Sequence, residues 1–107
     1  MVRIPEIAST LCRRTPLLWA APLGCYLKLE SMQRTGSVKL RGAAMKLGRM
    51  SPMDRSAGVI TASAGNHGLG LAFAASQLGA DVTVVVPQHE VTRWKIKRRN
   101  PVTFKSI

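Results

Sequence analysis

The chain has few acidic residues and few aromatic rings. The first shortage limits the kinds of partner it can have, and the second limits the composition of its core. Its 107 residues include 16 Lys and Arg against 5 Asp and Glu, so the formal net charge is +11. Aromatic residues make up only 5% of the chain and hydrophobic residues 46%, which predicts one folded domain with an aliphatic core. The charge indicates a polyanionic partner, an anionic cofactor, or a chain that lacks its acidic half.

Cysteines and long apolar runs are also scarce. Cys12 and Cys25 form no close pair and have no metal-ligand spacing, so we expect two reduced thiols in a cytoplasmic protein. The longest charge-free stretch, residues 15–27, is too short to cross a bilayer, and Pro16 and Pro22 interrupt it. No signal-peptide cleavage site follows. We therefore expect no membrane association.

Apolar runs and helical spacing alternate along the chain. Strands are expected at residues 25–30, 58–62, 82–86 and 102–105. Helices are expected between and around them, at residues 38–48, 67–78 and 89–100. This order predicts an α/β fold: a parallel sheet of about four strands with helices on both faces. The first of these strands could belong to a second domain.

The stretch "TASAGNHGLG", residues 61–70, leaves one predicted strand and opens a helix. Ligands of parallel sheets bind beyond the carboxyl ends of strands, and a helix N-terminus there offers free backbone N–H groups. The glycine spacing fits neither the dinucleotide fingerprint nor the Walker loop. From composition alone, an anion-binding loop and a plain turn capped by Ser63 or Asn66 are equally good interpretations. His67 by itself is typical of a helix start.

A second candidate stretch is "TGSVKLRGA", residues 35–43, in which Lys39 falls in the first turn of a predicted helix. Burial and the positive end of the helix dipole would both disfavour its ammonium form and leave the free amine that a Schiff base needs. Taken alone, one lysine among 16 basic residues is better interpreted as solvated surface.

The two stretches together change that interpretation. "TGSVKLRGA" followed by "TASAGNHG", with "TPL" and "YLKLE" upstream, resembles the fold-type II pyridoxal-phosphate enzymes from about Arg14 to Pro87. Within that group it is most similar to threonine/serine dehydratases and their serine-racemase relatives. The resemblance implies a tryptophan-synthase-β-like fold, here incomplete, and pyridoxal 5'-phosphate held as an aldimine on Lys39. It also implies a small hydroxy amino acid as substrate, and a homo-oligomer for the complete protein.

The resemblance also assigns roles to single residues. Lys39 would additionally move the substrate α-proton, and Asn66 would bind the ring hydroxyl of the cofactor. The loop that would bind the substrate carboxylate consists of Ser63, Ala64, Gly65, Asn66 and His67. The implied reaction is β-elimination of a serine- or threonine-type amino acid to a 2-oxo acid and ammonia. The racemases carry a serine at the position of Ala64, so alanine favours dehydration over racemisation.

One part of the family pattern is missing. Relatives wrap the cofactor phosphate in a second glycine-rich loop, and no run of three or four glycines occurs in this sequence. We therefore expect residues 1–107 to form a single, incomplete region that is inactive by itself. Residues 88–107 match the family weakly. A non-catalytic, nucleic-acid-binding remnant is the alternative; it would use Trp94 and the basic residues Arg93, Lys95, Lys97, Arg98, Arg99 and Lys105.

Overall fold

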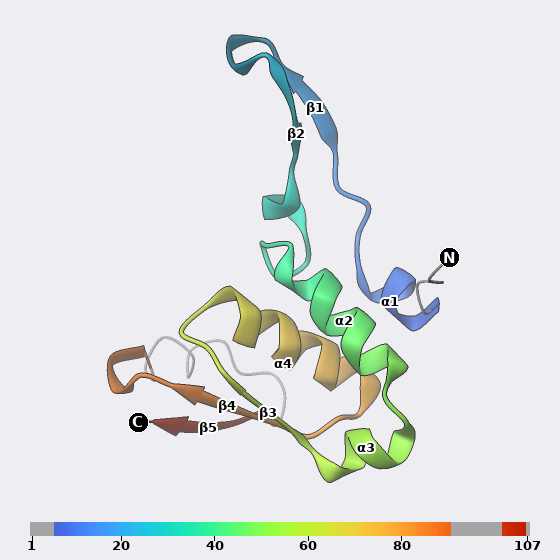
Figure 1. The fold of residues 1–107 in the computed structure, drawn as a ribbon, viewed down its shortest axis with the longest axis vertical. Helices are drawn as coiled ribbons and strands as arrows, with labels where there is room; N and C mark the ends of the chain where they lie inside the picture. The colour runs from blue at the N-terminus through green and yellow to red at the C-terminus, as the bar shows by residue number, and fades with distance from the viewer. Residues whose placement is uncertain (1–5, 91–101, 107) are drawn as a thin grey trace.

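The protein consists of a small parallel sheet with helices packed on it and a hairpin arm, residues 17–28, that extends away from them (Figure 1). This computed structural model describes residues 6–90 and 102–106. The Cα radius of gyration is 15.3 Å, larger than the roughly 13 Å of a compact domain of this length. The arm accounts for the elongated shape.

The sheet has three parallel strands in the order β3-β4-β5: β3 (Val59–Ala62), β4 (Val82–Val86) and β5 (Val102–Ser106). Val82 lies opposite Val59 on one side and Val102 on the other. The parallel pairing and the α/β class are therefore confirmed. The expected number of about four strands is wrong, because the strand expected at residues 25–30 lies in the arm.

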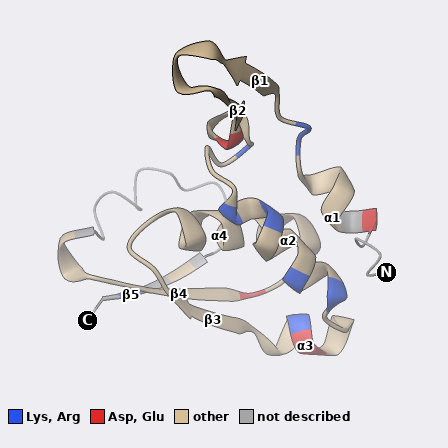
Figure 2. Ribbon diagram, turned by 45° about the horizontal axis from the view of Figure 1, so that its top comes forward, with Lys and Arg blue, Asp and Glu red and all other residues tan. Residues whose placement is uncertain are grey.

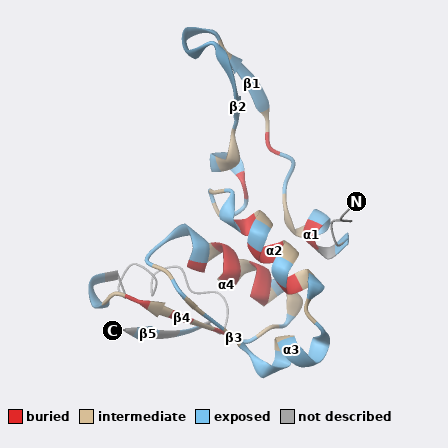
Figure 3. Ribbon diagram, viewed as in Figure 1, coloured by how far each residue is buried: buried red, intermediate tan, exposed pale blue. Residues whose placement is uncertain are grey.

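Four helices accompany these strands: α1 (Glu6–Leu11), α2 (Lys39–Arg49), α3 (Pro52–Ala57) and α4 (Asn66–Leu78). Helix α4 packs on β4, α2 packs along α4, and α1 packs on α2. Figure 3 shows that the buried residues concentrate on these facing surfaces. They are small and aliphatic, as the composition predicts: Ala8, Leu40, Ala43, Ala44, Leu47, Leu71, Ala74, Ala75, Val82, Val84 and Val86.

The described helices cover one face of the sheet. Alternate residues of β4 are buried in the core beneath α4, whereas Ile60, which points to the other face, is 76% exposed. The helix expected at residues 89–100 lies outside the described residues. In the described part of the chain, no helix has the length and apolar character needed to cross a membrane.

The hairpin arm is an antiparallel pair of β1 (Leu17–Ala20) and β2 (Cys25–Lys28). Its turn is the short 3-10 helix Ala21–Leu23, after which Gly24 takes a left-handed conformation with φ of 62°. Pro22, one of the two prolines that interrupt the charge-free stretch, lies inside this turn. The chain therefore reverses, and the second strand pairs with the residues just before it.

Both faces of the arm are exposed, and of its strand residues only Ala20 is partly buried. Trp19 and Tyr26 lie opposite each other across the strands. Their rings pack edge to face, with 5.1 Å between the ring centroids. Such a cross-strand aromatic pair stabilises an antiparallel ladder. A two-stranded hairpin is only marginally stable alone, so the arm depends for its stability on the contacts at its base.

The α2–α4 packing predicts a large penalty for Leu47→Ala. The Leu47 side chain is 0% exposed, and its loss should lower the free energy of unfolding by about 2–5 kcal/mol. Met53→Ala is the matched control, because Met53 is 81% exposed on α3, and its effect should stay within about 0.5 kcal/mol. Denaturant titration measures both. Equal effects would contradict the packing described above.

Candidate functional site: a lysine and a glycine loop at one groove

The glycine loop begins where β3 ends and is held by one serine. The Ser63 N–H donates to the Val85 carbonyl at 3.0 Å, which continues the ladder by one residue. The Ser63 hydroxyl oxygen then accepts from the N–H of Gly65 at 3.2 Å and of Gly68 at 2.9 Å. Gly68 is the third residue of α4, so Ser63 caps the helix from a position before the chain enters it.

The same loop leaves other backbone donors free. Within the described residues, the N–H groups of Ala64, Asn66 and His67 have no hydrogen-bond acceptor. All three residues are exposed. The last two form the start of α4, where the helix dipole favours negative charge. This geometry suits an anion such as a carboxylate.

The His67 ring turns back toward the sheet. Its Nε2 lies 3.1 Å from the Thr61 hydroxyl on β3. Thr61 was not among the residues that sequence reasoning selected, because nothing in the local pattern indicates that the first turn of α4 reaches this strand. The ring is therefore held beside the loop, and the backbone N–H of His67 has no acceptor among the described residues.

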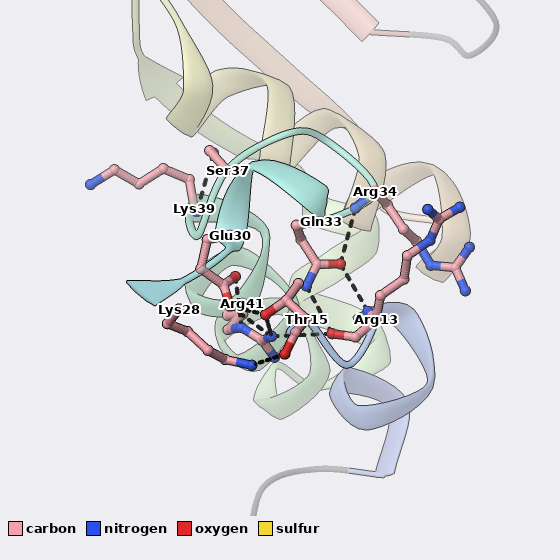
Figure 4. A network of polar contacts seen from close by, with 9 residues as sticks. All are labelled: Arg13, Thr15, Lys28, Glu30, Gln33, Arg34, Ser37, Lys39 and Arg41. Carbon is pink, nitrogen blue, oxygen red and sulfur yellow. Dashed lines mark hydrogen bonds and ion pairs between the residues drawn. The ribbon is translucent and has the colours of Figure 1, made fainter. Parts of the chain in front are cut away.

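Lys39 is the first residue of α2, and its backbone N–H donates to the Ser37 hydroxyl at 3.3 Å. Its side chain is exposed and extends away from the neighbouring polar network (Figure 4). The expected desolvation of this lysine is therefore wrong for the described chain. Its amine forms no ion pair among the described residues.

Lys39 and one loop residue, His67, line a groove of about 290 Å³ between α2, β3 and α4. Lys39 lines it from α2, Thr61 from β3 and His67 from α4. The other loop residues of the predicted site, 63–66, connect two of these walls without lining the groove. The remaining lining is mostly apolar: Val38, Gly42, Ala43, Lys46, Val59 and Leu71.

A polar network fixes the start of α2 to the base of the arm (Figure 4). Arg41 makes a two-pronged ion pair with Glu30: Nε donates to one carboxylate oxygen at 3.0 Å and Nη2 to the other at 2.9 Å. The buried Thr15 hydroxyl also donates to Glu30, at 2.6 Å. Arg41 reaches the Arg13 carbonyl at 3.1 Å as well. We call Arg13, Thr15, Glu30, Gln33 and Arg41 the Arg41 network.

Gln33 completes this network from a buried position. Its side-chain oxygen accepts from the N–H of Arg13 at 2.8 Å, and its side-chain nitrogen donates to the Arg13 carbonyl at 3.0 Å. Sequence reasoning missed these contacts because they join segments far apart in the chain. No spacing rule indicates such pairs.

The ion pair dominates the electrostatics of this region. Hydrogen bonds from Arg41 and then from Thr15 lower the pKa of Glu30 from its ordinary 4.5 to about 2. The same pair raises the pKa of Arg41. Burial raises the pKa of the Cys12 thiol nearby. Both Cys12 and Cys25 are free, as the sequence predicted.

The described residues bear on two other kinds of site. No cluster of three or more His, Cys, Asp or Glu residues in the described part of the chain could hold a metal ion. Of the basic residues proposed for nucleic acid, only Lys105, exposed on β5, belongs to the described residues. The basic residues that Figure 2 shows along α2 include Lys39 and Arg41 themselves.

Comparison with known proteins identifies the family. Residues 8–100 match the model described as "Pyridoxal-phosphate dependent enzyme", so the chain belongs to this family. The catabolic L-threonine dehydratase TdcB of Staphylococcus aureus is 47% identical over 83 residues, which cover 71% of this chain and 24% of that protein. The L-threonine ammonia-lyase of Thermotoga maritima is 45% identical over 106 residues, 91% of this chain and 26% of that protein. The chain thus spans about a quarter of their length.

Solved structures agree. Threonine deaminase isoform 2 of Solanum lycopersicum superposes with a TM-score of 0.73 at 33% identity, over 83% of this chain and 27% of that one. Serine racemase from Dictyostelium discoideum superposes with a TM-score of 0.77 at 26% identity, over 94% of this chain and 36% of that one. Maize serine racemase, at 24% identity, shares the fold with a TM-score of 0.80, over 97% of this chain and 34% of that one. The expected tryptophan-synthase-β-like class is confirmed.

The ion pair between Arg41 and Glu30 predicts that part of the free energy of unfolding depends on pH, and Glu30→Gln should abolish this dependence. Because the folded-state pKa of Glu30 lies at about 2, below its ordinary 4.5, its contribution to stability is complete above pH 4.5 and is lost as the pH falls through 2. The difference in free energy of unfolding between wild type and E30Q should therefore shrink over that range. Denaturant titrations from neutral to acid pH measure it, with Glu6→Gln on exposed α1 as control. A difference that does not vary with pH would contradict the pairing.

Proposed function

We propose that this chain carries the lysine half of the active site of a pyridoxal-phosphate-dependent threonine/serine dehydratase. The observation that carries the proposal is the groove that Lys39 shares with His67, the last residue of the glycine loop. Similarity to L-threonine dehydratases supports the reaction class. The substrate is a hydroxy amino acid, and the products are a 2-oxo acid and ammonia. Two free thiols fit a cytoplasmic location, and the complete protein is proposed to be a homo-oligomer.

The residues present fit the cofactor at its attachment point. Lys39 offers an exposed amine without an ion pair among the described residues, at a groove close to the lower end of the roughly 300–1,000 Å³ usual for ligand pockets. When bound, pyridoxal phosphate supplies an electron sink for the bond broken at the α-carbon. Lys39 Nζ would hold the cofactor and would serve as the base for the substrate α-proton. The exposed Asn66 is proposed for the ring hydroxyl.

The glycine loop is proposed to bind the substrate carboxylate, with the work divided among its residues. The free N–H groups of Ala64, Asn66 and His67 are the donors. Ser63 is already engaged, since its N–H bonds to β4 and its hydroxyl caps α4. It therefore shapes the loop instead of binding substrate directly. Gly65 allows the substrate to approach the backbone, because no side chain covers it.

Racemisation of serine is the second candidate, supported by the fold shared with two serine racemases. It needs an acid on the second face of the substrate. Ala64 has no proton to give, and this favours dehydration.

Reductive labelling tests the role of Lys39 in the chain itself. After incubation with pyridoxal phosphate and reduction with borohydride, peptide mapping should find the largest share of label on Lys39. Lys39→Ala should remove this peak, while Lys46→Ala should keep it, because Lys46 lines the same groove but lies further along α2. Label spread evenly over all lysines would contradict the assignment.

A chimera tests the reaction. We expect the Thermotoga maritima ammonia-lyase with its aligned segment replaced by this chain to form 2-oxo acid from threonine. Lys39→Ala should lower this rate by at least about 10²-fold, because the proton transfer loses its base. Ala64→Ser should add racemisation of serine, measured by chiral chromatography, with Ala62→Ser as the control just outside the loop. Racemisation by the Ala64 chimera itself would favour the second candidate.

A further inference from the structure

The two helices that frame the groove touch backbone to backbone at one residue. A β-carbon added at Gly70 on α4 would lie 2.9 Å from the Leu40 backbone nitrogen and 3.0 Å from the Lys39 carbonyl carbon. The Leu40 α-carbon would be 3.1 Å away. Real side chains do not come this close, so any residue other than glycine must push the helices apart.

We propose that Gly70 is a positioning residue for Lys39. Its missing side chain lets the first turn of α2 rest on α4, and this fixes where the Lys39 amine stands relative to the glycine loop. Gly70 touches neither substrate nor cofactor and acts only through the backbone of residues 39 and 40. The inference rests on the function proposed above for Lys39.

The surroundings leave no other way to absorb a side chain at this position. The atoms facing Gly70 belong to the backbone, so they cannot rotate away as a flexible side chain would. Leu40 is 0% exposed, and Ala43 and Ala74 fill the same interface. On its other side, α2 is held by the Arg41 network, only two residues after Lys39. A methyl group at Gly70 would therefore displace the start of α2 against both restraints.

Leu47→Ala provides the control. The Leu47 side chain is fully buried between α2 and α4, two turns away from Lys39. Its loss destabilises the same interface without changing a residue of the groove, so it separates a general loss of packing from a displaced Lys39.

The test compares wild type, G70A and L47A by two measurements. The first is the ratio of borohydride-fixed pyridoxal phosphate on Lys39 to that on Lys46, under conditions where each chain is folded. We expect G70A to lower this ratio about tenfold, since small displacements of a reacting group are costly, and L47A to leave it unchanged. The second is a nuclear Overhauser contact between the Gly70 α-protons and the Leu40 amide in the cofactor-free wild type.

Each outcome is decisive. An unchanged ratio in G70A, or the same fall in L47A, would overturn the positioning role, as would absence of the Gly70–Leu40 contact. If wild type shows no preference for Lys39 although the contact is present, the proposed function fails and this inference with it. Should G70A unfold, a stabilising osmolyte is added. A G70A chain that stays unfolded there while L47A folds would make Gly70 a requirement of the fold alone, and would also overturn the proposal.

Discussion

The close packing of α2 against α4 is the constraint on which the rest of the structure depends. Small residues such as Ala43, Ala44 and Ala74 let the helices approach, and the larger Leu40 and Leu47 fill the space between them. Close packing of this kind tolerates little change in volume. Because α4 also packs on β4, the position of α2 relative to the sheet follows from this one interface. The groove between Lys39 and the glycine loop exists as its consequence.

The Arg41 network performs a different task, since it joins segments that the hydrophobic core does not reach. The arm is exposed on both faces and contributes little buried area. A bidentate ion pair between Arg41 and Glu30 lies at its base. Thr15 also donates to Glu30, and Arg41 also donates to the Arg13 carbonyl, so the network orients the arm on α2. Arg41 is half-exposed, so solvent and salt screen this ion pair and limit its contribution to the free energy of unfolding. Its main effect is to fix the orientation of the arm relative to α2.

At the glycine loop, structure and function draw on the same backbone groups. A helix start has several N–H groups without partners. Ser63 satisfies one in α4 and one just before it, which is enough to fix the turn. The N–H groups of Ala64, Asn66 and His67 remain available to a ligand. A loop capped more fully would be more stable by itself and less able to bind an anion.

The sequence by itself determined the family, the α/β class, the strands of the parallel sheet and the two stretches that are proposed to carry the site. These follow from local patterns: β-branched runs, helical spacing, and glycine at positions where a side chain would interfere. Only the tertiary structure decided that residues 17–28 form an arm, that Lys39 is exposed, and that Gly70 touches Leu40. Strand partners, burial and contacts between distant backbones depend on which segments meet in space, and local pattern does not record that.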